Sequence, residues 1–224
     1  MSITENYRRT IAEGSSPERA NAFSDAVFAI AMTLLVLEIH VPQEPGTDLA
    51  GSLAALVPAY LTFVLSFVVV GVVWMSHHRK FRVIERIDQT MLRLNLLMLL
   101  FVASLPLPTA ILGRFGDARL SVYIYAATIA AIGFLMSAMW IYAWHRGFLA
   151  AAVDLGVFRY VLVQSFPIPG MFLLSIPIAL LFGAAVAEFA WALTLPLSLV
   201  ITRVYRMRRI TMVVSRPDPE RLPS

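Results

Sequence analysis

The sequence predicts an all-α integral membrane protein with six transmembrane helices in each subunit. The first observation is composition: 59% of the 224 residues are hydrophobic and 14% are charged, with a mean hydropathy of +0.76, whereas about 25% of residues are charged in soluble proteins. The second is a series of continuous apolar runs of about 20 residues, the length at which a helix crosses a bilayer. Because these runs do not alternate with polar residues, they exclude a transmembrane β-barrel.

The predicted helices form one six-helix transmembrane domain, 19–203. It lies between a cytoplasmic segment, 1–18, and a basic cytoplasmic tail, 204–224. The six apolar runs span residues 19–39, 53–76, 91–112, 120–144, 159–182 and 185–202. Prolines interrupt the third run at Pro106 and Pro108, and the fifth at Pro167, Pro169 and Pro177. We expect kinks that neighbouring helices cover, because a proline leaves backbone carbonyls unpaired in a medium without water.

The basic residues indicate the orientation. Of the 18 Lys and Arg residues, 16 fall on the side that holds both termini, and only Arg114 and Arg119 fall on the other. Since cytoplasmic loops are enriched in Lys and Arg, both termini are predicted to be cytoplasmic. The same distribution explains the pI of about 9.8, so we expect no nucleic-acid partner. The opposite side carries acidic residues, either as solvated loop charges or as a mouth that concentrates cations.

No residue pattern predicts catalysis. The sequence contains no cysteine, which excludes thiol nucleophiles and thiolate metal sites. It also has no glycine-rich phosphate loop, no His-Glu-x-x-His and no nucleophile elbow. The adjacent His77 and His78 project about 100° apart on a helix and have no second carboxylate, so a structural metal is not expected. We predict a protein that is not an enzyme and has no cofactor.

The first predicted helix holds the most unusual polar residues. Ser16 is a suitable N-cap and Pro17 suits the first helical position. Asp25 then lies two turns into the helix, where an ionisable side chain costs about 2.5–3.5 kcal/mol to insert and marks a functional site by default. At 100° per residue, Asp25 and Ile30 point about 140° apart. Ile30, Leu34 and Leu37 form an aliphatic row on the other face of the helix.

The carboxylate of Asp25 needs hydrogen-bond donors at this depth. Donors occur near the corresponding ends of the next two predicted helices, and we expect Ser24 and Asp25 to meet them. These candidate partners are Trp74, His77, His78 and Asn95. An alternative for the two histidines is an interfacial pair that reaches toward the headgroups.

These residues resemble a known family. The segment Arg19-Ala20-Asn21-Ala22-Phe23-Ser24-Asp25 is similar to the Arg-x-x-x-Phe-Ser-Asp signature of the endosomal and lysosomal potassium channels, the transmembrane protein 175 family, in its single-repeat prokaryotic form. The likeness continues through 26–39, 74–78 and 95–97 to Pro106-Leu107-Pro108-Thr109, which is roughly the first half of the chain. The second half agrees in hydropathy only.

The resemblance implies a homotetramer in a prokaryotic inner membrane, with potassium passing through a pore lined by the first helix. By position, the constriction would be Ile30, Leu34 and Leu37, with Thr33 beside them and the permeant potassium near Ile30 and Thr33. The signature residues Arg19, Phe23, Ser24 and Asp25 would have a structural role behind the pore wall. An apolar constriction would favour potassium over sodium moderately, because potassium loses its water more cheaply.

Two other classes of function stay open on the sequence. One is a proton-coupled secondary transporter with Asp25 as the proton carrier and a site at the broken fifth helix, since broken helices build ion sites in transporters. The other is a membrane enzyme or scaffold, for which no catalytic pattern exists. Without the signature, the row formed by Ile30, Leu34 and Leu37 would be ordinary packing surface.

Overall fold

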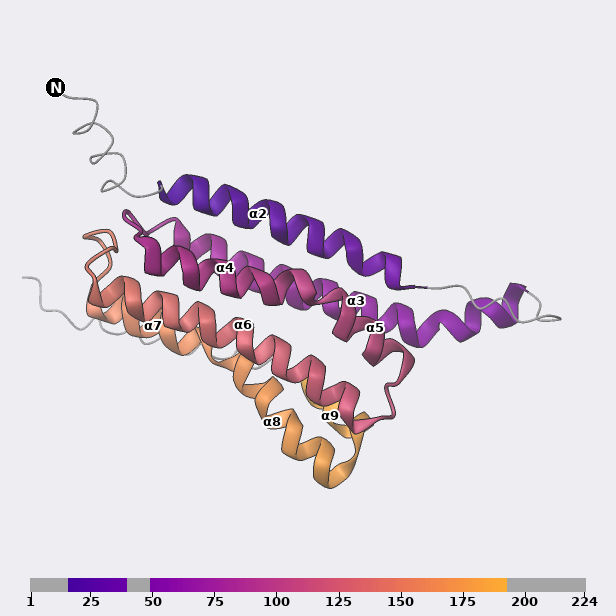
Figure 1. Ribbon diagram of the computed structural model, residues 1–224. Coiled ribbons are helices and arrows are strands. Elements are labelled where there is room, and N and C mark those ends of the chain that lie inside the picture. Colours follow the sequence, from indigo (N-terminus) through magenta and orange to yellow (C-terminus); the bar gives the residue numbers. More distant parts are fainter. Residues whose placement is uncertain (1–15, 40–48, 193–224) are drawn as a thin grey trace, which may run out of the picture.

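The computed structural model of the chain describes residues 16–39 and 49–192, which form a bundle of long helices (Figure 1). In chain order the elements are α2 (Pro17–Leu34), the 3₁₀ turn η1 (Leu35–Glu38), α3 (Leu49–Phe81), α4 (Gln89–Ser104), α5 (Pro106–Arg114), α6 (Arg119–His145), α7 (Leu155–Ser165), α8 (Pro167–Phe182) and α9 (Ala184–Ala192). The predicted all-α class is confirmed over these residues.

Five helical stretches in this part of the chain are long and apolar enough to cross a membrane. They are Pro17–Glu38, Leu49–Phe81, Gln89–Arg114, Arg119–His145 and Leu155–Phe182. Each overlaps one of the first five predicted runs. The sixth predicted run begins as α9, and its continuation after residue 192 lies outside the described residues, as do most of the segment 1–18 and all of the tail 204–224.

Two helices extend four or more residues past an end of the apolar run that predicted them. Helix α3 continues five residues past the predicted end at residue 76, because His77 stacks on Phe81 with ring centroids 4.2 Å apart and bonds to Asn95. Helix α7 begins at Leu155 rather than at 159, because the Asp154 carboxylate caps it by accepting from the Val157 N–H at 2.7 Å. Hydropathy identifies the apolar part of a helix that crosses the membrane. Polar contacts at the ends allow the helix to continue beyond that part.

The predicted proline breaks are present at Pro106 and Pro167, whereas α8 continues through Pro177 without a break. Helix α4 gives way to α5 at Pro106, and α7 gives way to α8 at Pro167. Pro167 and Pro169 are buried, and a Cβ atom added at Gly133 of α6 would lie 2.6 Å from the ring of Pro169. Glycine at position 133 therefore allows α6 and α8 to approach closely at the break.

Helix α6 lies in the centre of the bundle, between α4 on one side and α8 on the other (Figure 1). Tyr125 of α6 packs against Phe172 and Trp191, with ring centroids 5.9 and 5.2 Å away. Its hydroxyl lies 3.0 Å from Ser66 Oγ, which accepts from Thr109 Oγ1 at 3.0 Å. Helix α2 lies on the outer side of the bundle, against α3 and α4.

The loops after α3 and α6 meet at the end of the bundle where α2 begins (Figure 1). The Glu85 N–H donates to the Phe148 carbonyl at 2.9 Å, and the Ala150 N–H donates to the Val83 carbonyl at 2.9 Å. The basic residues of both loops thus share one end of the molecule, as their grouping in the sequence predicts.

Asp88 joins these loops to the helices. Its carboxylate accepts from the Met91 N–H at 2.9 Å, which caps α4, and from the Tyr142 hydroxyl at 2.6 Å, and Arg146 Nε lies 3.9 Å away. Burial acts to raise the pKa of Asp88, but these donors and the Arg146 charge outweigh it and hold the pKa below its usual value. The carboxylate therefore stays charged and fixes the loop against α6.

Candidate functional site

Helix α2 has two faces of different character. Its buried residues recur at helical spacing and pack against α3 and α4; they are Ala20, Ser24, Phe28 and Ala31, followed by Leu35 of η1. Ser16 caps the helix by accepting from the Arg19 N–H at 3.4 Å, and Pro17 takes the first helical position, as predicted from the sequence. The cap fixes where the helix starts and hence which residues face the bundle.

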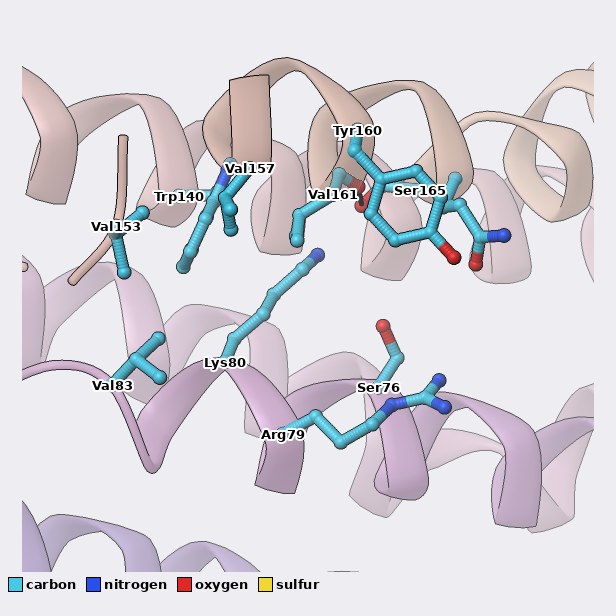
Figure 2. Close-up of a pocket in the computed structure, with 11 residues that line it drawn as sticks. Ser76, Arg79, Lys80, Val83, Trp140, Val153, Val157, Tyr160, Val161 and Ser165 are labelled. Carbon is cyan, nitrogen blue, oxygen red and sulfur yellow. Dashed lines mark hydrogen bonds between the residues drawn. The ribbon is translucent and has the colours of Figure 1, made fainter. Parts of the chain in front are cut away.

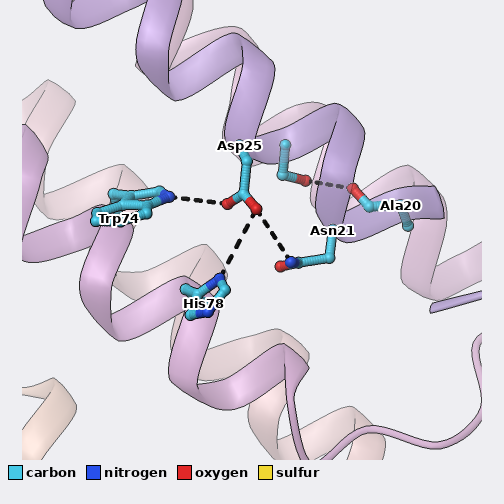
Figure 3. Close-up of polar contacts among 6 residues, drawn as sticks. Ala20, Asn21, Asp25, Trp74 and His78 are labelled. Carbon is cyan, nitrogen blue, oxygen red and sulfur yellow. Dashed lines mark hydrogen bonds and ion pairs between the residues drawn. The ribbon is translucent and has the colours of Figure 1, made fainter. Parts of the chain in front are cut away.

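Asp25 lies at the contact between α2 and α3, where it accepts two hydrogen bonds and lies near His78 (Figure 3). The Trp74 indole N–H donates to Oδ1 at 2.8 Å and the Asn21 amide donates to Oδ2 at 3.1 Å. His78 Nδ1 lies 3.7 Å from Oδ2, and about a third of the Asp25 side chain is exposed. Hydrogen bonds to an ionised acceptor are roughly twice as strong as neutral ones, so this cluster ties α2 to α3.

Ser24 starts a second, fully buried chain of hydrogen bonds. Its hydroxyl donates to the Ala20 carbonyl at 2.8 Å and accepts from Asn95 Nδ2 at 2.9 Å. Asn95 Oδ1 lies 3.0 Å from His77 Nε2, which assigns the ring proton to Nε2. This chain connects α2, α4 and α3 through one residue from each.

The two histidines thus have different environments. His77 is 1% exposed, between the rings of Phe28 and Phe81, and cannot reach the headgroups. The interfacial interpretation is therefore wrong for His77. His78 is partly exposed and faces Asp25. Of the four candidate partners expected for Ser24 and Asp25, Trp74 and His78 lie beside Asp25, whereas Asn95 bonds to Ser24 and His77 bonds to Asn95.

The remaining signature residues do not join either cluster. Arg19 is exposed, and the Phe23 side chain is 54% exposed. Asn21 was missed as a partner of Asp25, although its position four residues earlier on the same helix face, with an amide donor, is a signal that could have identified it. Over the described residues, no group of three or more His, Cys, Asp or Glu side chains lies close enough to hold a metal ion.

The opposite face of α2 and η1 is uncovered in the single chain. Ile30, Leu34 and Leu37 are 59%, 40% and 65% exposed. In a 3₁₀ turn, residues three apart eclipse each other, so η1 places Leu37 in line with Leu34. Thr33 is exposed beside them, and its hydroxyl donates to the Ile30 carbonyl at 2.8 Å. The hydroxyl proton is thereby occupied, and the oxygen keeps its lone pairs for another partner.

Fold and site together define an α-helical integral membrane protein whose first described helix is anchored by polar clusters on one face and leaves an aliphatic row uncovered on the other. The chain belongs to the TMEM175 family: the model of the endosomal/lysosomal potassium channel TMEM175 matches residues 19–106. The resemblance read from the signature is confirmed.

Relatives of known function support this assignment. A potassium channel of Chamaesiphon minutus is 42% identical over 137 residues, covering 58% of this chain and 68% of that protein. A potassium channel of Streptomyces collinus is 39% identical over 132 residues, covering 57% and 63%. The endosomal/lysosomal proton channel TMEM175 of Danio rerio is 29% identical over 155 residues, which are 66% of this chain and 30% of that much longer protein.

The fold also matches a solved structure. The crystal structure of a lysosomal potassium-selective channel TMEM175 homolog from Chamaesiphon minutus superposes with a TM-score of 0.64 at 33% identity, over 86% of this chain and 97% of that one. The likeness in three dimensions therefore extends beyond the half of the chain that carries the sequence motifs.

Proposed function

We propose that this protein is a potassium-permeable ion channel formed by four copies of the chain, with a pore lined by α2 and η1. The observation that carries the proposal is the uncovered aliphatic row of Ile30, Leu34 and Leu37 on the face opposite the anchored one. Since one α2 cannot enclose a pore, several copies must bring these faces together. The relatives named as potassium channels support potassium as the permeant ion.

The proposed constriction would select by dehydration. An apolar ring removes water from an ion without replacing it. Because potassium holds its water less tightly than sodium, its dehydration costs less free energy. The Thr33 oxygen, with its proton held by the Ile30 carbonyl, would return part of the lost coordination beside Ile30. We therefore propose moderate selectivity for potassium over sodium.

In this proposal the two polar clusters are positioning elements. Asp25 with Trp74 and His78, and Ser24 with Asn95 and His77, tie α2 to α3 and α4. They hold the rotation of α2 about its axis, which determines whether the aliphatic row points at the pore. Arg19 and Phe23, exposed in the single chain, are available for contacts between subunits.

The proposed assembly lies in the inner membrane of a prokaryotic cell, with both termini cytoplasmic. The basic loops after α3 and α6 lie at the end of the bundle where α2 begins, and this supports the orientation because cytoplasmic loops carry the excess of Lys and Arg.

A proton-coupled transporter has less support. Asp25 would have to act with the break between α7 and α8, but its partners come from α2 and α3. At that break, Pro169 packs against Gly133 of α6.

The test is potassium and sodium flux into liposomes that contain the purified protein, for wild type, Ile30→Asn and Leu180→Asn. Leu180 is 58% exposed on α8 and serves as a matched control away from α2. A polar ring at position 30 should ease hydration in the constriction, so that sodium flux rises relative to potassium flux, while Leu180→Asn keeps the wild-type ratio. If Ile30→Asn left both the rate and the selectivity unchanged, α2 would not line the pore.

A further inference from the structure

The amine of Lys80 is buried without a hydrogen-bond partner among the described residues. Its Nζ is fully buried near the end of α3 and has no hydrogen-bond partner in the part of the chain that the structure describes; the whole residue is 6% exposed. A buried lysine without a partner is costly. The aliphatic stem accounts for burial of the carbons, but it gives no reason for an amine at this position.

The Lys80 amine projects into a cavity of about 320 Å³ between α3, α6 and α7 (Figure 2). Ser76 and Arg79 enter it from α3, and Tyr160 and Ser165 face them from α7. A second cavity, of about 460 Å³, is also lined by Ser76, Arg79, Lys80 and Ser165 and continues along the prolines of the α7–α8 break. We call the two together the Lys80 crevice.

The polar lining suits a tetrahedral oxyanion. Lys80 supplies an amine and Arg79 a guanidinium, and Ser76, Tyr160 and Ser165 add hydroxyl groups to the lining; the Ser165 hydroxyl donates its proton to the Val161 carbonyl at 2.7 Å. Among the described lining residues of both cavities there is no Asp or Glu, so an anion entering the crevice would meet no opposing carboxylate. Arg donates a planar fork that matches phosphate, and Lys adds a compact charge.

The apolar lining indicates what carries the anion. The apolar walls of the smaller cavity are Val83, Trp140, Val153, Val157 and Val161, and Gln164 completes its lining. The smaller cavity is lined by the last residues of α3 and by α7, which lie toward the end of the bundle that carries the basic loops (Figure 1). The headgroups of anionic lipids gather at that end in the proposed orientation. A phosphate group attached to apolar chains would contact both the polar and the apolar residues of the lining.

We propose that the Lys80 crevice binds a phosphate group and that the bound group links α3 to α7. Phospholipid headgroups and inorganic phosphate share this chemistry, and the experiment below separates them. The site lies apart from the aliphatic row of α2 and does not depend on how the pore conducts.

The proposal is tested by the thermal stability and native mass spectrometry of the full-length protein in detergent after removal of lipid. Three additions are compared: phosphatidylglycerol, phosphatidylcholine and inorganic phosphate. The variants are Lys80→Met, which keeps the stem and removes the amine, and Ser165→Ala as a milder change. Arg82→Met is the matched control, because Arg82 is exposed at the same end and does not line the crevice.

Phosphatidylglycerol should raise the melting temperature of wild type and of Arg82→Met, and Lys80→Met should weaken its binding at least about tenfold. Without any addition, Lys80→Met should melt at or above the wild-type temperature, because it removes an unpaired buried amine. Stabilisation by inorganic phosphate as well would make the site a general phosphate site, and stabilisation by phosphatidylglycerol alone would make it a lipid site. Equal binding of phosphatidylcholine and phosphatidylglycerol that is lost in Lys80→Met would support recognition of the shared phosphate. Binding that is equal in Lys80→Met and wild type would overturn the proposal.

Discussion

At the scale of single residues, Asn95 lies at the centre of the Ser24–Asn95–His77 hydrogen-bond chain. We call this chain, together with the Asp25 cluster, the α2 anchor. Asn95 is 2% exposed, donates to Ser24 through Nδ2 and accepts from His77 through Oδ1. Leaving a buried polar group without a partner costs about 1–3 kcal/mol. A change at Asn95 therefore affects two neighbours on two other helices, and the anchor responds as a connected unit.

We expect this connection to appear in a double-mutant cycle. Ser24→Ala and Asn95→Ala should each lower the free energy of unfolding by about 1–3 kcal/mol, and the double variant by clearly less than their sum, because the two side chains share one hydrogen bond. Reversible unfolding of the purified protein in detergent measures the three values.

Ser24→Ala combined with Trp74→Phe is the control cycle, since Trp74 bonds to Asp25 and belongs to the other cluster. It should be closer to additive. Equal coupling energies in the two cycles would contradict the separation of the Ser24 cluster from the Asp25 cluster.

At the scale of helices, the close approach of α6 and α8 depends on a missing side chain. A Cβ atom at Gly133 would lie 2.6 Å from Cβ and Cγ of Pro169, whereas a Cβ at Gly170 would have nothing within 4 Å. Gly133 lies in the middle of α6 and Gly170 near the start of α8. The packing around the two glycines is therefore different.

Gly133→Ala should therefore destabilise the protein by about 1–3 kcal/mol through overpacking. Gly170→Ala should be neutral or slightly stabilising, because alanine loses less backbone entropy in a helix than glycine does. Thermal unfolding of the two variants side by side provides the measurement. Equal stability of the two variants would mean that α6 and α8 are not held as closely as the structure places them.

At the scale of the whole molecule, the proposed pore requires several copies of the chain, because a single α2 cannot enclose one. The absence of cysteine in the sequence permits a direct test, because a single introduced thiol has no competitor. We expect Leu34→Cys to give covalent dimers with a short bismaleimide, since position 34 would face the shared axis. Leu180→Cys, on the exposed side of α8, should stay monomeric on a denaturing gel.

Cross-linking at both positions, or at neither, would contradict the proposed axis. The native mass of the detergent-solubilised protein gives the number of copies, for which we expect four. A monomeric mass would remove the proposed pore altogether, because a single α2 encloses nothing.

Hydropathy and helix caps predicted much of the fold because both are local. Ser16 and Pro17 predicted where α2 begins, and the apolar runs predicted the stretches long enough to span a membrane. The same reasoning ended α3 too early, at residue 76, because it scores the polar residues 77–80 by their cost in lipid. The contacts of His77 and His78 with α2 and α4 are a tertiary property that no local score contains.

The candidate site divides in the same way. The 140° offset between Asp25 and Ile30 follows from helical geometry alone, and so does the separation of a polar face from an aliphatic face. Which donors reach Asp25 does not: Trp74, His77, His78 and Asn95 were all chemically suitable, and only the approach of α3 and α4 assigned two to Asp25 and two to the Ser24 chain.

By itself, the sequence determined that this chain is a helical membrane protein of the TMEM175 family, with an anchored face and an aliphatic face on its first described helix. These properties depend on composition, on periodicity and on a contiguous motif. Only the tertiary structure decided the partners of the anchor, the close contact at Gly133 and the buried amine of Lys80. Each of these depends on residues far apart in the chain, and their distances are fixed by how the helices pack.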